Sequence, residues 1–319
     1  MKPFPVILDL EHRILKIVSS KNSYIHDDCA YLSKSHQLIS TDTLVENVHF
    51  DQNHFNASEI AHRLFVCSFS DIQSSGGYPE YALLNVSFPS KNFKITQQIV
   101  KFFKKLLAKY NIKLIGGDTT ASSKIYLSST FISKPIKKNK IINRKNAQVG
   151  DSIYTFSNIG LSKLGYLSLF KKQYLKKNLL LKSKGQFLKP KIINYSNLFN
   201  RYKINSCMDI SDSLYFSLNE LSVQSKKKFF IDNLKDISPL LFRNFNFNKY
   251  LSLVLSSGEE FMPVFTGKLS NQDIKNFKKN RINIIKIGSV QKGRGVIFTE
   301  LKNFKDKTFN HFKNTYLNV

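Results

Sequence analysis

Apolar residues alternate with polar ones, or run together, at several places in the first part of the chain. The pattern predicts strands over residues 29–33, 37–41, 81–88, 112–116 and 124–132. The segments 57–73 and 94–110 instead place apolar residues at helical spacing, and Gly76 and Gly77 follow the first as a stop signal. Helices that lie between strands predict an α/β domain in this part of the chain.

A polar and basic stretch, residues 133–151, separates this part from the rest of the chain. Beyond it the pattern predicts strands over 152–156, 228–232, 262–266 and 282–290, and helices over 160–170, 212–225 and 271–280. Residues 171–206 are rich in Lys and Asn and are expected to be helical in part. The expected fold class is therefore α/β, with two domains that cover residues 1–137 and 147–319.

Length and composition allow two domains with buried cores, because the chain has 319 residues and 42% of them are hydrophobic. No uncharged apolar run reaches the roughly 18 residues of a membrane span, so we expect no membrane partner. The first 16 residues mix acids and prolines into their apolar stretch, which argues against a secretory signal. Three scattered cysteines without a CxxC pair favour a reducing, cytoplasmic location.

The net charge of +27 has two interpretations. It fits a nucleic-acid or other anionic partner, but it also fits a composition biased towards Lys, Asn, Ile and Phe. The lysines are spread along the whole chain and no nucleic-acid-binding motif is present, so we do not expect a nucleic-acid partner.

Acidic residues are scarce, and they concentrate in a few short motifs. Only 22 residues are Asp or Glu, and seven aspartates lie in "HDDCA", "STDTLVENVHF", "SDIQSSGG", "GGDTT" and "MDISDSL". Two carboxylates about 4 Å apart repel by about 4 kcal/mol at an effective dielectric of about 20, so converging acids either take up protons or bind cations. Carboxylates with Ser and Thr hydroxyls, and no His or Cys cluster, favour Mg²⁺ and thus a nucleotide.

Each motif also has a plain structural explanation. A single Asp after a strand is usually a turn or helix cap, as Asp71 or Asp212 alone could be. His49 could be a partly buried surface histidine, and Arg144 a solvated charge or a phosphate clamp. The sequence contains no GxxxxGK[ST] P-loop and no protein-kinase HRD or DFG motif, so a nucleotide site must be built differently.

Taken in order, the motifs resemble those of the thiamine-monophosphate kinase family, within the AIR-synthetase-like (PurM-like) ATP-binding superfamily. The resemblance rests on "HDDCAYL", "ISTDTLVENVHF", "SDIQSSGGYP", "LIGGDTT", "NRKNAQVGDSIY", "MDISDSL", "LSSGEEF" and the terminal "FNHF". It implies Mg²⁺-dependent direct transfer of the γ-phosphoryl group of ATP to thiamine monophosphate, which yields thiamine diphosphate. It also implies a homodimer formed through the sheet of the N-terminal domain, where strands 81–88 and 124–132 are candidates.

The resemblance also implies roles for individual residues. The expected metal ligands are Asp28, Ser40, Thr41, Asp42, Asp71, Asp118, Asp209 and Asp212, of which Asp42, Asp71 and Asp212 are the catalytic candidates. Gly117, Asp118, Arg144 and Ser211 match nucleotide contacts. His49, Glu259 and Phe309 match contacts to the acceptor.

Some positions depart from the family pattern. His26 and Ser213 stand where glycines are usual, Leu161 replaces an acid, and Glu260 replaces a shorter acid. We expect Ser213 to strain its loop, because a glycine there suggests unusual backbone torsions or a close approach. These departures keep two alternatives open, a catalytically decayed protein that binds nucleotide or thiamine phosphate, and another ATP-dependent enzyme of the superfamily.

Overall fold

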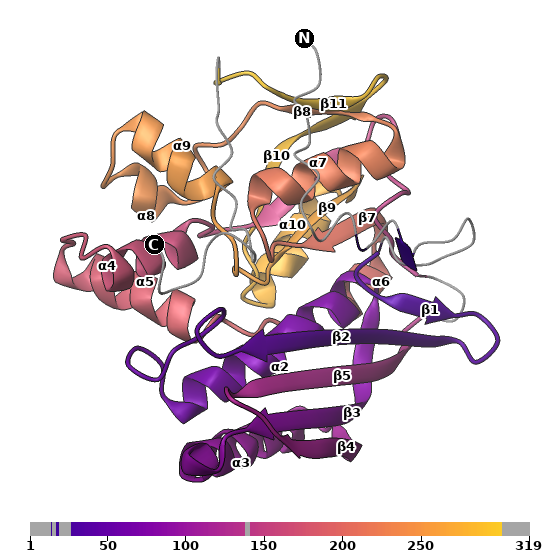
Figure 1. Cartoon of the computed structure of the whole chain (residues 1–319). Coiled ribbons are helices and arrows are strands. Elements are labelled where there is room, and N and C mark those ends of the chain that lie inside the picture. Colours follow the sequence, from indigo (N-terminus) through magenta and orange to yellow (C-terminus); the bar gives the residue numbers. More distant parts are fainter. Residues whose placement is uncertain (1–13, 15–16, 19–26, 138–140, 302–319) are drawn as a thin grey trace.

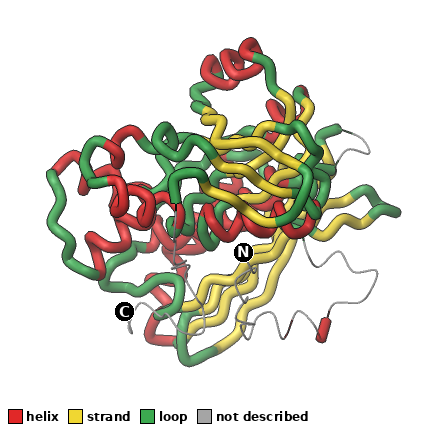
Figure 2. Tube along the Cα trace, turned by 90° about the horizontal axis from the view of Figure 1, so that it is seen from above, coloured by secondary structure: helices red, strands yellow, loops and turns green. Residues whose placement is uncertain are grey.

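The computed structural model describes residues 27–137 and 141–301, together with Ile14, Ile17 and Val18. Two mixed β-sheets form two domains, with helices between and around them (Figure 1). From above, the two groups of strands are seen with helices at their sides (Figure 2). Within the described residues, no helix is long and apolar enough to cross a membrane.

The first sheet has five strands in the order β1-β2-β5-β3-β4. The strands are β1 (Ala30–Leu32), β2 (Gln37–Val45), β3 (Gly77–Phe88), β4 (Lys113–Ala121) and β5 (Tyr126–Pro135). All neighbours are antiparallel except β3 and β4. Helices α2 (Ala57–Ser74) and α3 (Phe93–Lys109), the latter after the short turn η1 (Ser90–Asn92), pack on one face, and no helix of the described residues covers the opposite face (Figure 1).

The second sheet has six strands in the order β11-β8-β10-β6-β9-β7. Its strands are β6 (Ser152–Phe156), β7 (Lys203–Asp209), β8 (Lys228–Ile231), β9 (Pro263–Lys268), β10 (Ile284–Gln291) and β11 (Gly295–Phe298). The accompanying helices are α4 (Leu161–Phe170), α5 (Lys177–Leu188), α6 (Ser196–Arg201), α7 (Leu214–Ser225), α8 (Pro239–Phe242), α9 (Phe247–Leu255) and α10 (Asn271–Lys279). Only β8 and β11 run parallel.

Helix α2 lies between the two domains. It contacts β2, β3 and β5 of the first sheet and also β7 of the second. Of its 18 residues, 14 are buried, which is typical of a helix packed on all sides. Asn56 begins it with a capping box that includes Glu59, and Gly76, at φ +82°, follows its end.

Two strands run further than their hydrophobic pattern predicts. β2 continues through the STDT motif to Val45, and β4 contains the whole GGDTT motif, so neither motif is a loop. Hydroxyl and glycine residues weaken the alternating pattern, but pairing with β5 and with β3 keeps each segment extended.

The expected strain at Ser213 is wrong. Its backbone is extended, with φ −168° and ψ 158°, which any residue adopts. Ser213 is fully buried and is the N-cap of α7, where its Oγ accepts a hydrogen bond of 3.0 Å from the backbone N–H of Phe216. The helix accordingly begins at Leu214, whereas its sequence pattern predicts a start at Asp212.

This geometry predicts that Ser213→Ala lowers the free energy of unfolding by about 1 kcal/mol, because the N–H of Phe216 loses its acceptor. Ser213→Gly should cost only a few tenths of a kcal/mol, because glycine is itself a favourable N-cap residue. Urea unfolding of the two variants and the wild type measures both values. A stability gain in Ser213→Gly would mean that the loop is strained after all.

Candidate metal and nucleotide site

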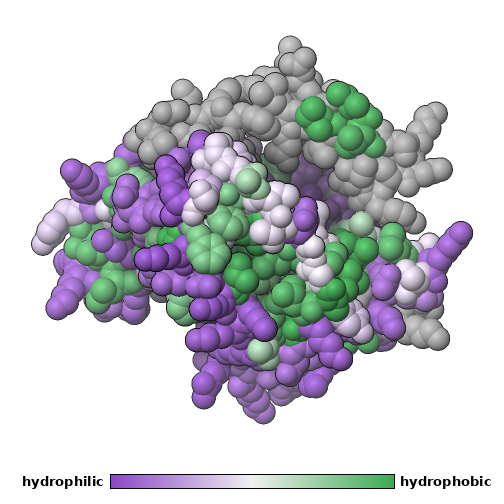
Figure 3. Space-filling view, turned by 60° about the horizontal axis from the view of Figure 1, so that its bottom comes forward, coloured by the Kyte–Doolittle hydropathy of each residue, from purple (hydrophilic) through white to green (hydrophobic). Residues whose placement is uncertain are grey.

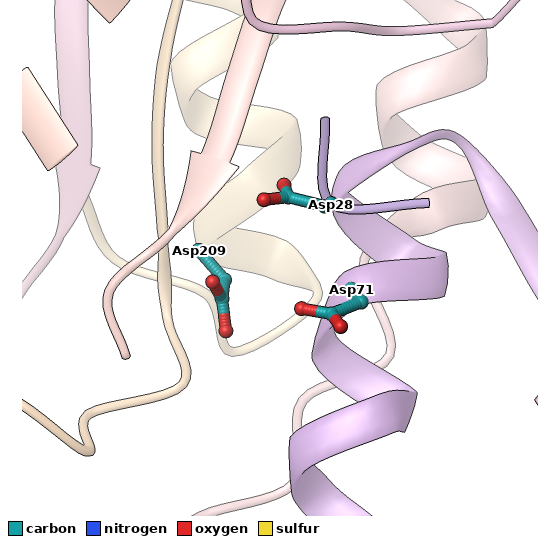
Figure 4. A group of neighbouring side chains, drawn as sticks. All are labelled: Asp28, Asp71 and Asp209. Atoms are coloured by element: carbon teal, nitrogen blue, oxygen red, sulfur yellow. The ribbon is translucent and has the colours of Figure 1, made fainter. Parts of the chain in front are cut away.

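Three carboxylates that are far apart in sequence converge between the domains. Asp28, Asp71 and Asp209 each place a carboxylate oxygen within 4.8 Å of the others (Figure 4). Asp28 stands just before β1, Asp71 lies near the end of α2, and Asp209 ends β7. The packing of α2 against β7 is what brings the second-domain acid to the two acids of the first domain.

Serine hydroxyls bind these acids from neighbouring positions. Ser40 donates to Asp71 at 2.6 Å, and Ser70 donates to Asp209 at 2.7 Å. Ser68 donates to Asp42 at 2.8 Å, from one turn before Asp71 on α2. The sequence motifs did not single out Ser68 and Ser70. Their position just before Asp71, in "SFSD", could have indicated hydroxyl groups near the predicted metal ligand.

The alternation of β2 decides which of its residues face this cluster. Ser40 and Asp42 lie on the side that packs against α2, whereas Thr41 points to the opposite face, where its hydroxyl bonds Thr130 at 2.9 Å. The structure therefore brings Ser40 and Asp42 to the carboxylates but does not bring the Thr41 side chain to them.

Burial and mutual repulsion both act on the acids. Burial, followed by the charge of Asp28, raises the pKa of the Asp209 carboxyl from 3.8 to about 8. Burial, followed by the charges of Asp42 and Asp209, raises the pKa of Asp71. Burial also raises the pKa of Asp42. Such a group of oxygen donors is stabilised either by protons or by a hard cation.

Arg144 supplies the positive charge nearest to the acids. Its Nε donates to Asp28 Oδ1 at 3.0 Å, and a second guanidinium N–H donates to the same oxygen. Its backbone N–H points to Asp27 at 3.4 Å. Burial, followed by the neighbouring Asp28, raises the pKa of Asp27 to about 7. Arg144 is therefore not a solvated surface charge in this structure.

Gly117 and Asp118 lie elsewhere on the first sheet. They are in β4, which is separated from β2 by β3 and β5, and Asp118 is exposed. Asp118 pairs with the exposed Asn85 on the face opposite α2, so the structure does not bring it to the three carboxylates. Gly117 has φ +150°, and a Cβ there would lie 1.8 Å from the carbonyl oxygen of Leu84, so its glycine is required by packing against β3.

Two loops of the second domain meet next to Asp209, one that follows β7 and one that follows α9. The backbone N–H of Glu259 donates to the carbonyl oxygen of Ser211 at 2.6 Å. A Cβ on Gly258 would lie 2.2 Å from the carbonyl oxygen of Asp212, so this contact requires a glycine. Ser211, Asp212 and Glu259 are thus held together.

The remaining predicted residues are placed as follows. His49 lies in the turn after β2, where its Nδ1 accepts a 3.0 Å bond from the backbone N–H of Val45. Phe309 and His26 lie outside the described residues. Leu161 is buried in the core of the second domain at the start of α4.

Glu260 explains how α4 begins without an acid of its own. This fully buried carboxylate accepts bonds from the backbone N–H groups of Gly160 at 2.7 Å and Ser162 at 3.2 Å, and from Ser257 Oγ at 2.6 Å. Burial raises the pKa of Glu260 to about 7. It therefore occupies the N-terminus of α4, where a negative charge is favourable.

Comparison with known proteins identifies a family and full-length relatives. The family "AIR synthase related protein, N-terminal domain" matches residues 26–133. The thiamine-monophosphate kinase of Buchnera aphidicola subsp. Schizaphis graminum is 34% identical over 304 residues, which cover 90% of this chain and 92% of that one. The enzyme of the same name from Nitrosopumilus maritimus is 30% identical over 314 residues, or 95% and 98% of the two chains.

A solved structure has the same architecture. AaThiL complexed with AMPPCP and TMP superposes with a TM-score of 0.79, at 24% identity, over 94% of this chain and 96% of that one. The two full-length relatives and the matching two-domain fold lead to one conclusion, that the chain belongs to the thiamine-monophosphate kinase family.

Proposed function

We propose that this protein transfers the γ-phosphoryl group of ATP to the phosphate of thiamine monophosphate. The observation that carries the proposal is the convergence of Asp28, Asp71 and Asp209 in a chain of this family. Asp42 is held close by through its hydrogen bond from Ser68 on α2. ATP and the acceptor phosphate are both anions, so a site that joins them must offset their repulsion. The acceptor is already a phosphate, so the reaction does not require a strong general base.

The donor set fits magnesium. All the converging groups are oxygen donors, and their raised pKa values mean that their ionised forms are destabilised, which a bound hard divalent cation would offset. The proposed ligands remain those expected from the sequence. Of these, Asp28, Asp42, Asp71 and Asp209 lie in one group within a single chain and could bind the cation together. When bound, Mg²⁺ supplies charge neutralisation and alignment of phosphate oxygens.

The chain's own residues then have distinct tasks. Ser40, Ser68 and Ser70 orient the carboxylates through the hydrogen bonds described above. Arg144 holds Asp28, and we propose that its charge also binds a nucleotide phosphate. For the acceptor we propose contacts from His49, Glu259 and Phe309. For the nucleotide we propose Gly117, Asp118, Ser211 and Asp212 in addition.

We also propose that two copies form a homodimer through the face of the first sheet that lies opposite α2 and α3. Ile39, Ile132 and Tyr81 lie side by side there on β2, β5 and β3. At the sheet edge, Leu114 and Ile115 of β4 are 41% and 54% exposed. Viewed with the β4 side forward, hydrophobic residues gather in the middle of the surface, with hydrophilic residues around them (Figure 3). An exposed edge strand and an apolar face favour pairing with another chain.

We place the protein in the cytoplasm. Cys29, Cys67 and Cys207 are all free thiols, as expected for a reducing compartment.

Incubation with Mg²⁺, ATP and thiamine monophosphate should produce thiamine diphosphate and ADP in equal amounts, measured after chromatographic separation.

Asp71→Asn should lower kcat by about a hundredfold or more, because it removes a charge at the centre of the site. Asp232→Asn, which changes an exposed acid in the second domain, is the matched control and should retain full activity. Nucleotide binding without product would indicate the decayed protein, and product only with another acceptor would indicate a different enzyme of the superfamily.

The raised pKa values predict how pH changes the stability of the metal-free protein. The Asp209 carboxyl titrates near 3.8 when unfolded and at about 8 when folded, so the folded state holds the extra proton between these values. The free energy of unfolding should therefore fall as pH rises from about 4 to about 8. Urea unfolding in EDTA at about pH 6 and about pH 8 measures this, and Mg²⁺ should restore stability at the higher pH. Asp71→Asn should flatten the dependence. A protein more stable at the higher pH would contradict burial and repulsion of the acids as the cause.

Light scattering at micromolar concentration should give the mass of a dimer. Ile132→Glu should shift the protein to monomer, because it buries a charge in the proposed interface. Gln98→Glu, with the same charge change on the exposed side of α3, should leave the dimer intact. A wild-type monomer with full activity refutes this assembly.

A further inference from the structure

Arg63 is a charged residue buried in the middle of α2. Its side chain is 1% exposed, and it is among the largest fully buried side chains of the described residues. An arginine keeps its charge in any protein environment, so burial is costly unless the surroundings supply acceptors and a countercharge. The sequence motifs did not select this residue.

Three elements meet at the Arg63 guanidinium. One amino group donates to the carbonyl oxygen of Phe187 at 2.7 Å, in the last turn of α5, where helix carbonyls lack partners of their own. The other forms an ion pair with Glu259 Oε1. The Cζ atom lies 5.3 Å and 5.2 Å from the ring centroids of Phe55 and Phe187, within the range of a cation–π contact. Arg63 therefore joins the first domain to α5 and to the loop that follows α9.

Glu259 is held from both its backbone and its side chain. Its φ is +55°, a left-handed conformation that is uncommon for residues other than glycine. Its backbone N–H bonds Ser211, while its Oε1 is taken by Arg63. The Glu259 side chain is 28% exposed, and its Oε2 has no hydrogen bond to any residue that the structure describes. One carboxylate oxygen is thus fixed and the other can meet a ligand.

We propose that Arg63 is a positioning residue for the acceptor, acting through Glu259. By holding one oxygen of Glu259, Arg63 sets the direction in which the second oxygen faces the thiamine part of the substrate, which carries a cationic thiazolium ring and an amino group. The same helix carries Asp71, so the ion pair also sets the acceptor-side loop relative to the carboxylate cluster. This inference rests on the proposed kinase function.

The test measures KM and kcat for each substrate in Arg63→Gln, Glu259→Gln, the double variant and Arg63→Lys. Arg63→Gln should raise the KM for thiamine monophosphate about tenfold, as loss of one partner of a buried charge pair does, and leave the KM for ATP within about twofold. The double variant should be no worse than the worse single variant, because both changes break one unit. Arg63→Lys should recover part of the affinity, and the exposed Arg243→Gln serves as the matched control.

Two outcomes overturn the inference. In one, Arg63→Gln lowers the melting temperature while both KM values stay unchanged, so that the role is structural only. In the other, the effects of the two single variants multiply in the double variant. Titration calorimetry measures binding of thiamine monophosphate without requiring its phosphorylation, and so tests the role of Arg63 separately from the kinase function. Wild type that binds the compound without phosphorylating it refutes the kinase proposal alone, and the Kd values then test Arg63. Wild type that does neither refutes both.

Discussion

The burial of α2 on all sides is the constraint from which the rest of the structure follows. A helix between two sheets has no solvent-facing side on which to place its polar residues, so a polar side chain there is costly to bury unless it finds a partner inside the protein. Those of α2 find theirs largely in the second domain. Ser70 bonds Asp209, Arg63 bonds Phe187 and Glu259, and the Gln73 side chain accepts from the N–H groups of Tyr195 and Ser196. The domain interface is therefore specified by polar bonds as well as by apolar contact.

The same constraint concentrates negative charge at one end of the helix. Asp71 is carried to Asp28 and Asp209, and burial makes the repulsion between them stronger than it would be in water. Serine hydroxyls and Arg144 offset part of this cost, but the raised pKa values show that part of it remains. Holding the acids together lowers the stability of the metal-free fold, and a cation that binds them in the folded state raises it again.

Charge of the opposite sign is buried eight residues earlier on α2. Arg63 is stabilised by Glu259 and by two phenylalanine rings, and Glu259 in turn packs against the loop of Ser211 and Asp212. One rigid helix thus carries a cationic anchor for the second-domain loop and an acid of the candidate metal site. Rigid elements hold reacting groups more closely than loops do, which suits a transfer between two bound anions.

The sequence by itself determined the class of fold and most of the strands and helices, and its motifs included the three acids that the structure brings together. Hydrophobic periodicity is a local property, and the motifs around Asp28, Asp71 and Asp209 stand out because acids are scarce in this chain. Only the tertiary structure decided which motif residues meet. Strand alternation turned Thr41 away from Asp42, and strand order placed Asp118 on the far side of the sheet. Arg63 escaped notice because an arginine within a helical pattern normally predicts an exposed face, and its burial depends on partners in the second domain that lie more than a hundred residues later in the chain.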